Sequence, residues 1–347
     1  METHTGKVTW RSPSNIAIIK YWGKHGNQLP KNPSLSFTLS RAYTTTEVSY
    51  RPAGTAHPQV DFLFEGRHRP DFSERIEAYT DVLKNHFPVL RGYDVVIRSE
   101  NSFPHSTGIA SSASAMSALA LCFASIAYDL ENRQVDQAFW PEVSHLARLG
   151  SGSACRSVLG PVAVWGATRY VDGSTDKYAV PVHAVHDRFR TLRDSILIVD
   201  NGPKAVSSSA GHQLMHGHPY ADTRFEQAQH NLDALMRALA TGDMDAFIAL
   251  TEHEALSLHA MMMTSSPGYL LLRPGTLHII EKVRQVRSEE QLPVCFTLDA
   301  GPNVHLLYPQ DAEQRVRAWI DSELAQHCQD GRMIHDQAGS GPVQLDG

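Results

Sequence analysis

The chain has 347 residues, 42% of them hydrophobic, and its 31 basic and 37 acidic side chains leave a formal net charge of −6. This length and apolar content predict a folded protein with two domains rather than one. Neither sign of charge forms a long run, so we expect no nucleic-acid partner and no membrane partner. Any anionic ligand therefore has to be bound by a local site.

The cysteines and the N-terminus indicate the compartment. Four cysteines are widely spaced and form no CxxC pair, which favours reduced thiols in a cytoplasmic protein. The first ten residues, METHTGKVTW, lack the apolar core of a signal peptide. The longest apolar run, residues 113–128, is short and rich in serine, so we do not expect it to span a bilayer.

Strand-like and helical patterns alternate along the chain. Strand patterns are found at 44–50, 93–99, 161–165, 195–200, 293–299 and 304–309, and helical periodicity at 73–86, 111–128, 137–148, 224–263, 275–288 and 310–327. The alternation predicts an α/β or α+β protein. Glycine- and serine-rich turns give way to long helices near 184–200, which predicts domains over 1–190 and 191–347. The polar, glycine-rich tail 336–347 is expected to fray.

Three local patterns suggest chemistry. In FPHSTGIASSASAMSALALC, residues 103–122, small residues lead into an alanine-rich helix, so backbone N–H groups and the helix dipole can approach a phosphate. The spacing matches neither a P-loop nor a Rossmann turn, and an ordinary capped core helix is an equal alternative.

A further stretch, SPSNIAIIKYWGKHG at 12–26, places two lysines, a tyrosine and a tryptophan directly behind an apolar strand.

The second pattern is LGSGSACRSVLGP, residues 149–161, in which small residues precede Arg156. Exposed amides beside one guanidinium can bind a carboxylate or phosphate, although a flexible turn with a surface arginine is the alternative. The third is FTLDAGPNVHLLY, residues 296–308, where an apolar strand ends in Asp299. This carboxylate either projects into a cleft or caps its own turn.

Together these motifs resemble the diphosphomevalonate decarboxylase family of the GHMP kinase superfamily. NIAIIKYWGK, LPKNPSLSFTLS, FPHSTGIASSASA, GSGSACRS, VSSSAG and LDAGPN occur in the family's order. The resemblance implies an α+β, two-domain GHMP-kinase-like fold. It has an N-terminal ribosomal-protein-S5-like domain, a C-terminal ferredoxin-like domain and an active site in the cleft between them.

The resemblance also implies an activity. The expected reaction is the ATP-dependent decarboxylation of mevalonate 5-diphosphate to isopentenyl diphosphate, ADP, phosphate and carbon dioxide. Asp299 matches the family's catalytic aspartate, which acts on the tertiary hydroxyl or stabilises positive charge at that carbon. Lys20 is expected beside it, favouring the ionised carboxylate. Arg156 is expected to hold the substrate carboxylate.

The remaining site residues follow from the same resemblance. Substrate binding is expected from Tyr21, Trp22, Gly23, Lys24, Arg75, Ser151, Gly152, Ser153, Ala154, Cys155, Ser208 and Ser209. ATP phosphates are expected at Ser106, Gly108, Ile109, Ala110, Ser111 and Ser112, bridged by Mg²⁺ whose protein ligands are not predicted. Arg75 aligns through a weakly matching region, and an exposed helix residue is its alternative. A homodimer is expected.

One position departs from the family. Ser209 falls where some bacterial members have arginine and others threonine, so a charge for the terminal phosphate is missing. Lys204 or His212 could compensate, or the preferred substrate is the 5-monophosphate. His212, His216 and His218 have no acidic or cysteine partner spaced for metal binding, so solvated loop histidines are expected. A sibling kinase without decarboxylation and a silent binding protein of the same fold remain alternatives.

Overall fold

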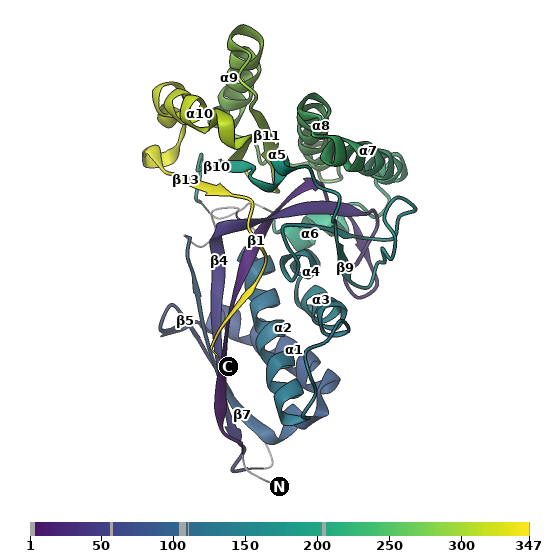
Figure 1. Cartoon of the computed structure of the whole chain (residues 1–347), viewed down its shortest axis with the longest axis vertical. Coiled ribbons are helices and arrows are strands. Elements are labelled where there is room, and N and C mark those ends of the chain that lie inside the picture. Colours follow the sequence, from purple (N-terminus) through teal and green to yellow (C-terminus); the bar gives the residue numbers. More distant parts are fainter. Residues whose placement is uncertain (1–3, 56–57, 104–108, 110, 203–205, 347) are drawn as a thin grey trace.

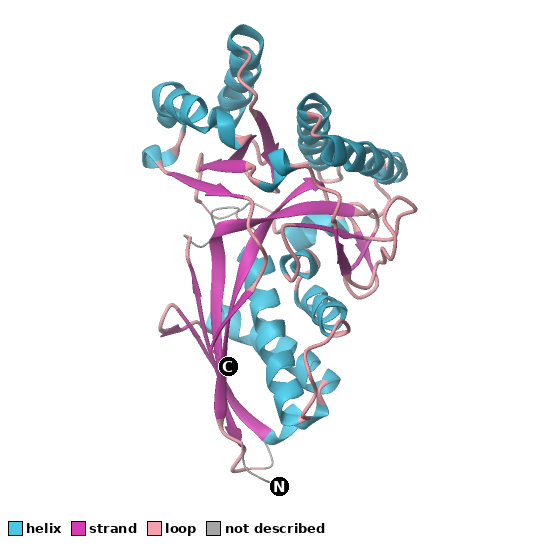
Figure 2. Ribbon diagram, viewed as in Figure 1, coloured by secondary structure: helices cyan, strands magenta, loops and turns pink. Residues whose placement is uncertain are grey.

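The computed structural model describes residues 4–346 except 56–57, 104–108, 110 and 203–205. These described parts contain two large sheets with helices stacked on them and a small two-stranded sheet (Figure 1, Figure 2). The strands are β1 Gly6–Ile19, β2 Lys24–His25, β3 Leu29–Pro30, β4 Ser34–Pro52, β5 Val60–Phe64, β6 Arg67–His68, β7 Tyr93–Asn101, β8 Val162–Trp165, β9 Ala179–Pro181, β10 Arg193–Leu197, β11 Cys295–Leu298, β12 Val304–Tyr308, β13 Met333–Gln337 and β14 Val343–Asp346.

The α-helices carry most of the remaining ordered chain. They are α1 Pro70–His86, α2 Ser111–Leu130, α3 Phe139–Gly150, α4 Ala154–Ser157, α5 Asp187–Arg190, α6 Ser208–Gln213, α7 Ala221–Thr241, α8 Met244–Met263, α9 Pro274–Glu290 and α10 Glu313–Trp319. The predicted helix 224–263 is therefore two helices. Gly242, at φ +80°, ends α7 in the left-handed conformation, and the Asp243 side chain accepts a hydrogen bond from the N–H of Ala246 to begin α8.

The first sheet has the order β14-β1-β4-β7-β5-β6, with β8 paired to the beginning of β4 and to β9. All its pairs are antiparallel except β5 with β7. The long strands β1 and β4 carry the sheet upward until they reach beneath the C-terminal helices (Figure 1). Their pairing is irregular between Pro13 and Asn15 and again between Ala17 and Ile19. Such bulges redirect a strand end, and the second one directly precedes Lys20.

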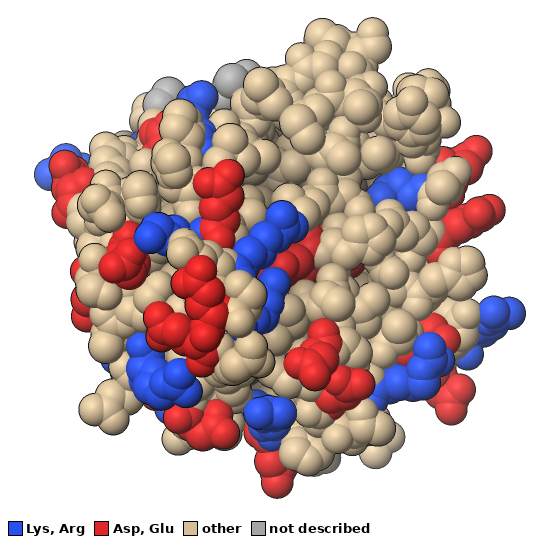
Figure 3. Space-filling view, turned by 90° about the horizontal axis from the view of Figure 1, so that it is seen from above, with Lys and Arg blue, Asp and Glu red and all other residues tan. Residues whose placement is uncertain are grey.

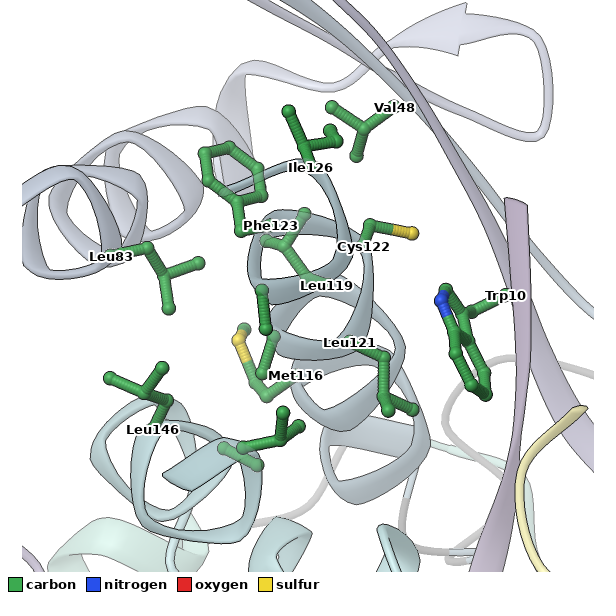
Figure 4. Packing of buried hydrophobic residues seen from close by; sticks show 14 of the residues in the cluster. Trp10, Val48, Leu83, Met116, Leu119, Leu121, Cys122, Phe123, Ile126 and Leu146 are labelled. Carbon is green, nitrogen blue, oxygen red and sulfur yellow. The ribbon is translucent and has the colours of Figure 1, made fainter. Parts of the chain in front are cut away.

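Helix α2 forms the centre of the N-terminal core. Its apolar residues pack against α1, α3 and the sheet, as Cys122, Phe123, Leu83, Leu146 and Trp10 show in Figure 4. Small residues let the helix approach the strands closely, and the Thr44 and Ser114 hydroxyls are 2.7 Å apart. By length and composition α2 is long and apolar enough to cross a bilayer, whereas the run 113–128 considered from the sequence was judged too short to do so. However, 78% of its apolar window is buried inside the protein, which makes it a core helix.

The second sheet is antiparallel with the order β11-β12-β10-β13. Helix α8 packs on β11 and extends toward the end of β1, and α9 and the segment from α10 onward cover the rest of the apolar strands. The predicted helix 310–327 is present as the short helix α10, continued by a π-helical turn over 320–324. Every residue of β11 and β12 is buried, including the polar Thr297 and His305.

The expectation of a frayed tail is wrong. Strand β13 belongs to the second sheet, whereas β14 returns to the first sheet and pairs with β1, placing Thr9 opposite Asp346. Within β13, the Asp336 carboxylate accepts hydrogen bonds from the backbone N–H groups of Ser40, Arg41 and Ala42 at 2.7–3.0 Å. The glycines and polar residues of this tail are used for close backbone contacts between the two sheets rather than for flexibility.

Candidate active site

A cleft of about 370 Å³ lies where β1, α2, α4, α6 and the loop after β11 meet. It brings together residues from every predicted motif: Lys20, Tyr21, Trp22, Lys24, Arg75, Ile109, Ser111, Ser112, Ser151, Gly152, Ser153, Arg156, Ser208, Ser209 and Asp299. These residues are up to 279 positions apart in the chain. The fold therefore assembles one site from segments that the sequence presents separately.

Some predicted residues do not line the cleft. Ala154 and Cys155 are fully buried at the start of α4, where the Cys155 thiol donates to the carbonyl of Gly152 at 3.0 Å. Gly23 contributes through its backbone, at φ +92° and with Phe225 too close for any side chain. Ser106, Gly108 and Ala110 lie outside the described residues, as does Lys204.

The charge of the cleft is opposite to that of the chain. Among the described residues lining it are four cations, Lys20, Lys24, Arg75 and Arg156, and a single carboxylate, Asp299. On the outer face shown in Figure 3, acidic and basic side chains are interspersed instead. A cleft lined by one sign of charge concentrates field lines and attracts a ligand of the opposite sign. The site is thus built for an anion although the whole chain is negative.

Lys20 and Asp299 form an ion pair in this cleft. The Lys20 Nζ is 3.2 Å from Oδ1 of Asp299, and the two side chains are 2% and 27% exposed. Burial lowers the pKa of Lys20, and the neighbouring Asp299 carboxylate opposes that shift. The backbone N–H of Lys20 donates to Glu254 at 2.8 Å, and Asn32 donates to its carbonyl at 2.9 Å. Both backbone groups of Lys20, its N–H and its carbonyl, are therefore held in place at the end of β1.

The backbone of Asp299 is fixed in the same way. Its carbonyl accepts hydrogen bonds from Gly301 N at 2.7 Å and from His259 Nε2 at 3.1 Å. Because Nε2 of His259 donates, this ring carries its proton there. Burial lowers the pKa of His259 to about 4, which keeps the ring neutral near pH 7. The carboxylate thus projects from a rigid strand end toward Lys20.

Arg156 is 2% exposed, and its described hydrogen-bond partners are all neutral. Its Nε donates to the Ser36 hydroxyl at 2.9 Å, Nη1 donates to the Ser34 hydroxyl, and Nη2 lies 3.4 Å from Oδ1 of Asn15. Burial lowers the pKa of Arg156, but a guanidinium stays charged in proteins. The predicted alternative of a surface arginine is wrong. A buried cation facing a cleft with N–H groups to spare suits a ligand carboxylate.

The aromatic wall of the cleft is closely packed. The hydroxyl of Tyr21 is buried and has no partner among the described residues, and burial raises the pKa of Tyr21 so that its proton is retained. A Cβ at Gly152 would lie 2.9 Å from that hydroxyl and 3.0 Å from the Trp165 ring. Only glycine permits this approach. Tyr21 is therefore an available hydrogen-bond donor beside the small-residue turn.

The serine-rich parts of the cleft supply hydroxyls from three elements. Ser112, in the first turn of α2, lies 3.3 Å from the Ser151 hydroxyl. Ser208 begins α6, behind Ser207, whose side chain accepts from the N–H of Ala210. Arg75 on α1 is exposed at the rim, where its Nη2 donates to the carbonyl of Gly150 at 3.1 Å. Arg75 therefore fits both its predicted location at the site and the alternative of an exposed helix residue.

Comparison with known proteins settles the family. Residues 12–179 match the model of the diphosphomevalonate decarboxylase-like N-terminal domain, and residues 195–344 match that of the mevalonate 5-diphosphate decarboxylase C-terminal domain. A diphosphomevalonate decarboxylase from Ganoderma lucidum is 31% identical over 324 residues, which cover 88% of this chain and 79% of the relative. The chain belongs to the diphosphomevalonate decarboxylase family.

Other relatives of this family are informative. A phosphomevalonate decarboxylase from Haloferax volcanii is also 31% identical, over 89% of this chain and 90% of the relative. Mevalonate diphosphate decarboxylase from Staphylococcus aureus superposes with a TM-score of 0.85 at 28% identity, over 99% of both chains. The complex of MDDEF with MVAPP, AMPPCP and magnesium gives a TM-score of 0.84 at 28% identity, over 99% and 100% of the two chains. The predicted family and the α+β, GHMP-kinase-like fold are confirmed.

Several residues of this decarboxylase-family site were missed from the sequence. Asn15, Ser34 and Ser36 hold Arg156, and Glu254 and His259 hold the backbones of the ion pair. The serines stand inside the quoted motif LPKNPSLSFTLS, so alternation along β4 could have placed them on the face toward Arg156. Glu254 lies within a long amphipathic helix pattern, where no local signal separates it from surface carboxylates.

The expectation for the loop histidines is wrong at two of three positions. His212 is 8% exposed and His218 7% exposed, whereas His216 is exposed. His218 Nε2 lies 3.1 Å from the carbonyl of Met261, and Nδ1 of His212 accepts the backbone N–H of Gly23 at 3.0 Å. The His212 ring also lies against the rings of Tyr21 and Trp22, which come from a distant segment. His212 is consequently an additional residue of the cleft.

Proposed function

We propose that the protein catalyses the ATP-dependent decarboxylation of mevalonate 5-diphosphate to isopentenyl diphosphate, ADP, phosphate and carbon dioxide. The observation that carries the proposal is one cleft that holds the Lys20–Asp299 ion pair together with Arg156, a buried cation whose described hydrogen-bond partners are neutral. This arrangement suits a substrate with a hydroxyl to activate and a carboxylate to hold. The names of the curated relatives and of the similar solved structures support the same reaction.

The chemistry requires two steps. A tertiary hydroxyl is a poor leaving group, so its oxygen first attacks the γ-phosphorus of ATP, and ADP departs. The C–O bond to the new phosphate group then breaks, and phosphate leaves. The C–C bond to the carboxylate breaks as well, carbon dioxide is released, and the electrons of this C–C bond form the alkene. Asp299 would accept or orient the hydroxyl proton and stabilise positive charge at the carbon. Lys20 would keep Asp299 ionised, and Arg156 would align the carboxylate with the breaking C–O bond.

The nucleotide would bind at the beginning of α2. Its phosphates would meet the helix N-terminus and the hydroxyls of Ser111 and Ser112. A second pocket of about 100 Å³ adjoins the cleft through these two serines and Arg75, and its walls are mostly apolar, with Phe62, Phe64, Phe72 and Ile97. An apolar slot beside a phosphate site suits a planar base, which would be the adenine of ATP.

Magnesium would be carried by the nucleotide. Within the described residues, no group of three or more His, Cys, Asp or Glu side chains is placed to hold a metal ion. The cleft offers Asp299 and serine hydroxyls, and Mg²⁺ usually takes its remaining ligands from substrate phosphates and water. This donor set fits an ion bound mainly by ATP, where it would neutralise phosphate charge during transfer.

The remaining expectations stand as proposals. We propose a division at residues 190/191, with the ATP loop before it and Asp299 after it, which is supported by the gap between the two matching family models at 179 and 195. Cytoplasmic location is supported by four cysteines that are all buried and unpaired. The homodimer is to be tested by light scattering of the purified protein.

The deciding experiment follows ADP and carbon dioxide together. The purified protein is incubated with ATP, Mg²⁺ and mevalonate 5-diphosphate, with a control lacking the mevalonate compound to measure background ATP hydrolysis. Equal amounts of both products are expected. ADP without carbon dioxide would indicate a sibling kinase, and neither product would indicate a binding protein.

A second candidate function is decarboxylation of the 5-monophosphate. Serine at position 209 and the Haloferax volcanii phosphomevalonate decarboxylase among the relatives favour testing it. The same assay with mevalonate 5-phosphate gives the comparison, and the larger kcat/KM identifies the substrate.

A further inference from the structure

His212 joins two separate parts of the cleft wall. It stands on α6 with Ser208 and Ser209, while its Nδ1 accepts a hydrogen bond from the N–H of Gly23, in the segment that follows β1. The imidazole also lies against the rings of Tyr21 and Trp22, at centroid distances of 4.4 and 4.5 Å. The ring is thus held in one position and one orientation.

The hydrogen bond from Gly23 determines where the ring carries its proton. Because Nδ1 accepts, the neutral imidazole has its N–H at Nε2. Among the described residues, Nε2 has no hydrogen-bond partner, although His212 is 8% exposed and lines the cleft. Burial, and secondarily Lys24, lowers the pKa of His212 to about 3, so the ring stays neutral. The cleft therefore contains a fixed donor that the described residues leave unused.

The other residues of the cleft limit what this donor can bind. Asp299 and Arg156 are engaged with the hydroxyl and carboxylate end of the proposed substrate. Lys24, Ser208 and Ser209 remain for its other end, and the described residues of α6 include no lysine or arginine. A hydrogen-bond donor beside one lysine and two hydroxyls suits a phosphoryl oxygen.

We propose that Nε2–H of His212 donates a hydrogen bond to the terminal phosphoryl group of a diphosphate substrate and so favours the diphosphate over the monophosphate. The inference rests on the proposed function for the identity of that substrate. Serine at position 209 lacks the charge that arginine gives some family members for the terminal phosphate. A hydrogen bond from His212 would supply a contact to that phosphate instead.

Two substitutions separate the two ends of the ring. His212→Asn keeps an acceptor near Gly23 but removes the distant donor, whereas His212→Gln can place an N–H near the Nε2 position but lacks the acceptor near Gly23. We expect His212→Asn to raise KM for mevalonate 5-diphosphate about 10- to 100-fold, the usual range for a hydrogen bond to a charged group. Its kcat, and its KM for the 5-monophosphate, should change by less than about 3-fold. His212→Gln should retain a KM near that of the wild type.

The opposite pattern would overturn the inference. If His212→Asn keeps the wild-type KM, or if both variants raise KM equally for the diphosphate and the monophosphate, His212 only holds the backbone of Gly23. Thermal unfolding of both variants checks that each is folded.

A measurement on the unmodified protein covers the case in which the variants do not fold or the wild type shows no turnover. Inorganic pyrophosphate is titrated into ¹⁵N-histidine-labelled protein, and the Nε2–H resonance of His212 is followed by NMR. A saturable shift of this resonance supports the contact whatever the catalysed reaction is. An unchanged resonance, or no pyrophosphate binding by calorimetry, overturns it, while failure of the decarboxylation assay alone would reject only the proposed function.

Discussion

Arg224 and Arg156 are both almost completely buried, at 3% and 2% exposure, but they are neutralised differently. Nη2 of Arg224, on α7, lies 2.6 Å from Oε2 of Glu254, which is on α8 and is itself fully buried. The described hydrogen-bond partners of Arg156 are two hydroxyls and an amide. The Asp299 carboxylate acts on the charge of Arg156, but it forms its ion pair with Lys20.

A buried charge without a counter-charge destabilises the folded protein. Such a charge is therefore expected only where another interaction, such as ligand binding, offsets the cost. Arg224 is compensated within the chain, so its role is to hold α7, α8 and the end of β1 together. Arg156 is compensated only when an anion enters the cleft. The comparison teaches that a buried arginine identifies a ligand site when its partners are neutral, and a structural site when a carboxylate is bound to it.

The largest expected effect is at Asp299, the carboxylate that pairs with Lys20 rather than with Arg156. Asp299→Asn keeps the shape of the side chain and removes its charge, so kcat should fall about 10²- to 10⁴-fold. ADP and carbon dioxide should decrease together, because phosphorylation precedes elimination. Normal ADP formation with loss of carbon dioxide would restrict Asp299 to the second step, and normal formation of both would exclude it from the reaction.

Removing the structural arginine should affect stability instead. Arg224→Met leaves Glu254 buried without a cation, and we expect the free energy of unfolding to fall by about 3–5 kcal/mol. Urea denaturation measures this loss. Adding Glu254→Gln in the same chain should restore much of it, and kcat/KM of the folded single variant should fall less than 10-fold. A single variant as stable as the wild type would contradict the structural role.

The functional arginine should show the reverse. Arg156→Lys keeps the charge but loses the two-point grip of the guanidinium, so we expect kcat/KM to fall about 10- to 100-fold. Arg156→Met should abolish turnover while the free energy of unfolding changes by less than about 1 kcal/mol or rises, because an uncompensated buried charge is removed. A loss of stability as large as that of Arg224→Met would erase the distinction between the two arginines.

The last prediction concerns His259, a buried histidine that is neutral and affects stability only in acid. The pKa of His259 is about 4 in the folded protein, below its ordinary value of 6.5, so the unfolded chain binds the proton first as the pH falls. Its contribution to stability is therefore lost between pH 6.5 and about 4, at about 1.4 kcal/mol per pH unit. His259→Gln keeps an N–H donor for Asp299 and should make the fall in stability with acid shallower by that amount.

The matched control is His216→Gln, because His216 is exposed on the loop between α6 and α7. Urea unfolding at several pH values should give it the wild-type slope. If His259→Gln also follows the wild-type slope, His259 is not the group that titrates.

The strand patterns and most of the helices were predictable because each depends on short-range periodicity, as in 93–99 and 111–128. Lys20, Asp299 and Arg156 were found for a different reason, because the motifs NIAIIKYWGK, LDAGPN and GSGSACRS that contain them resemble those of the diphosphomevalonate decarboxylase family. His212 was expected as a solvated loop histidine that could compensate for Ser209, and its burial was missed because it depends on Tyr21 and Trp22, almost two hundred residues earlier in the chain. The tail was misread because glycine and polar residues indicate flexibility unless a distant partner strand is known.

Strand β14 also bears on how the protein comes to be made. It pairs with β1, the first strand of the chain, yet it is synthesised after every other described element. The outer edge of the first sheet along β1 thus stays open throughout translation, although β4 and β7 are available early. An open edge can pair with other chains, and closing a loop that long is slow because its entropic cost is met late in folding. Nascent chains that have not yet released β14 therefore pass through a period in which self-association competes with completion of the fold.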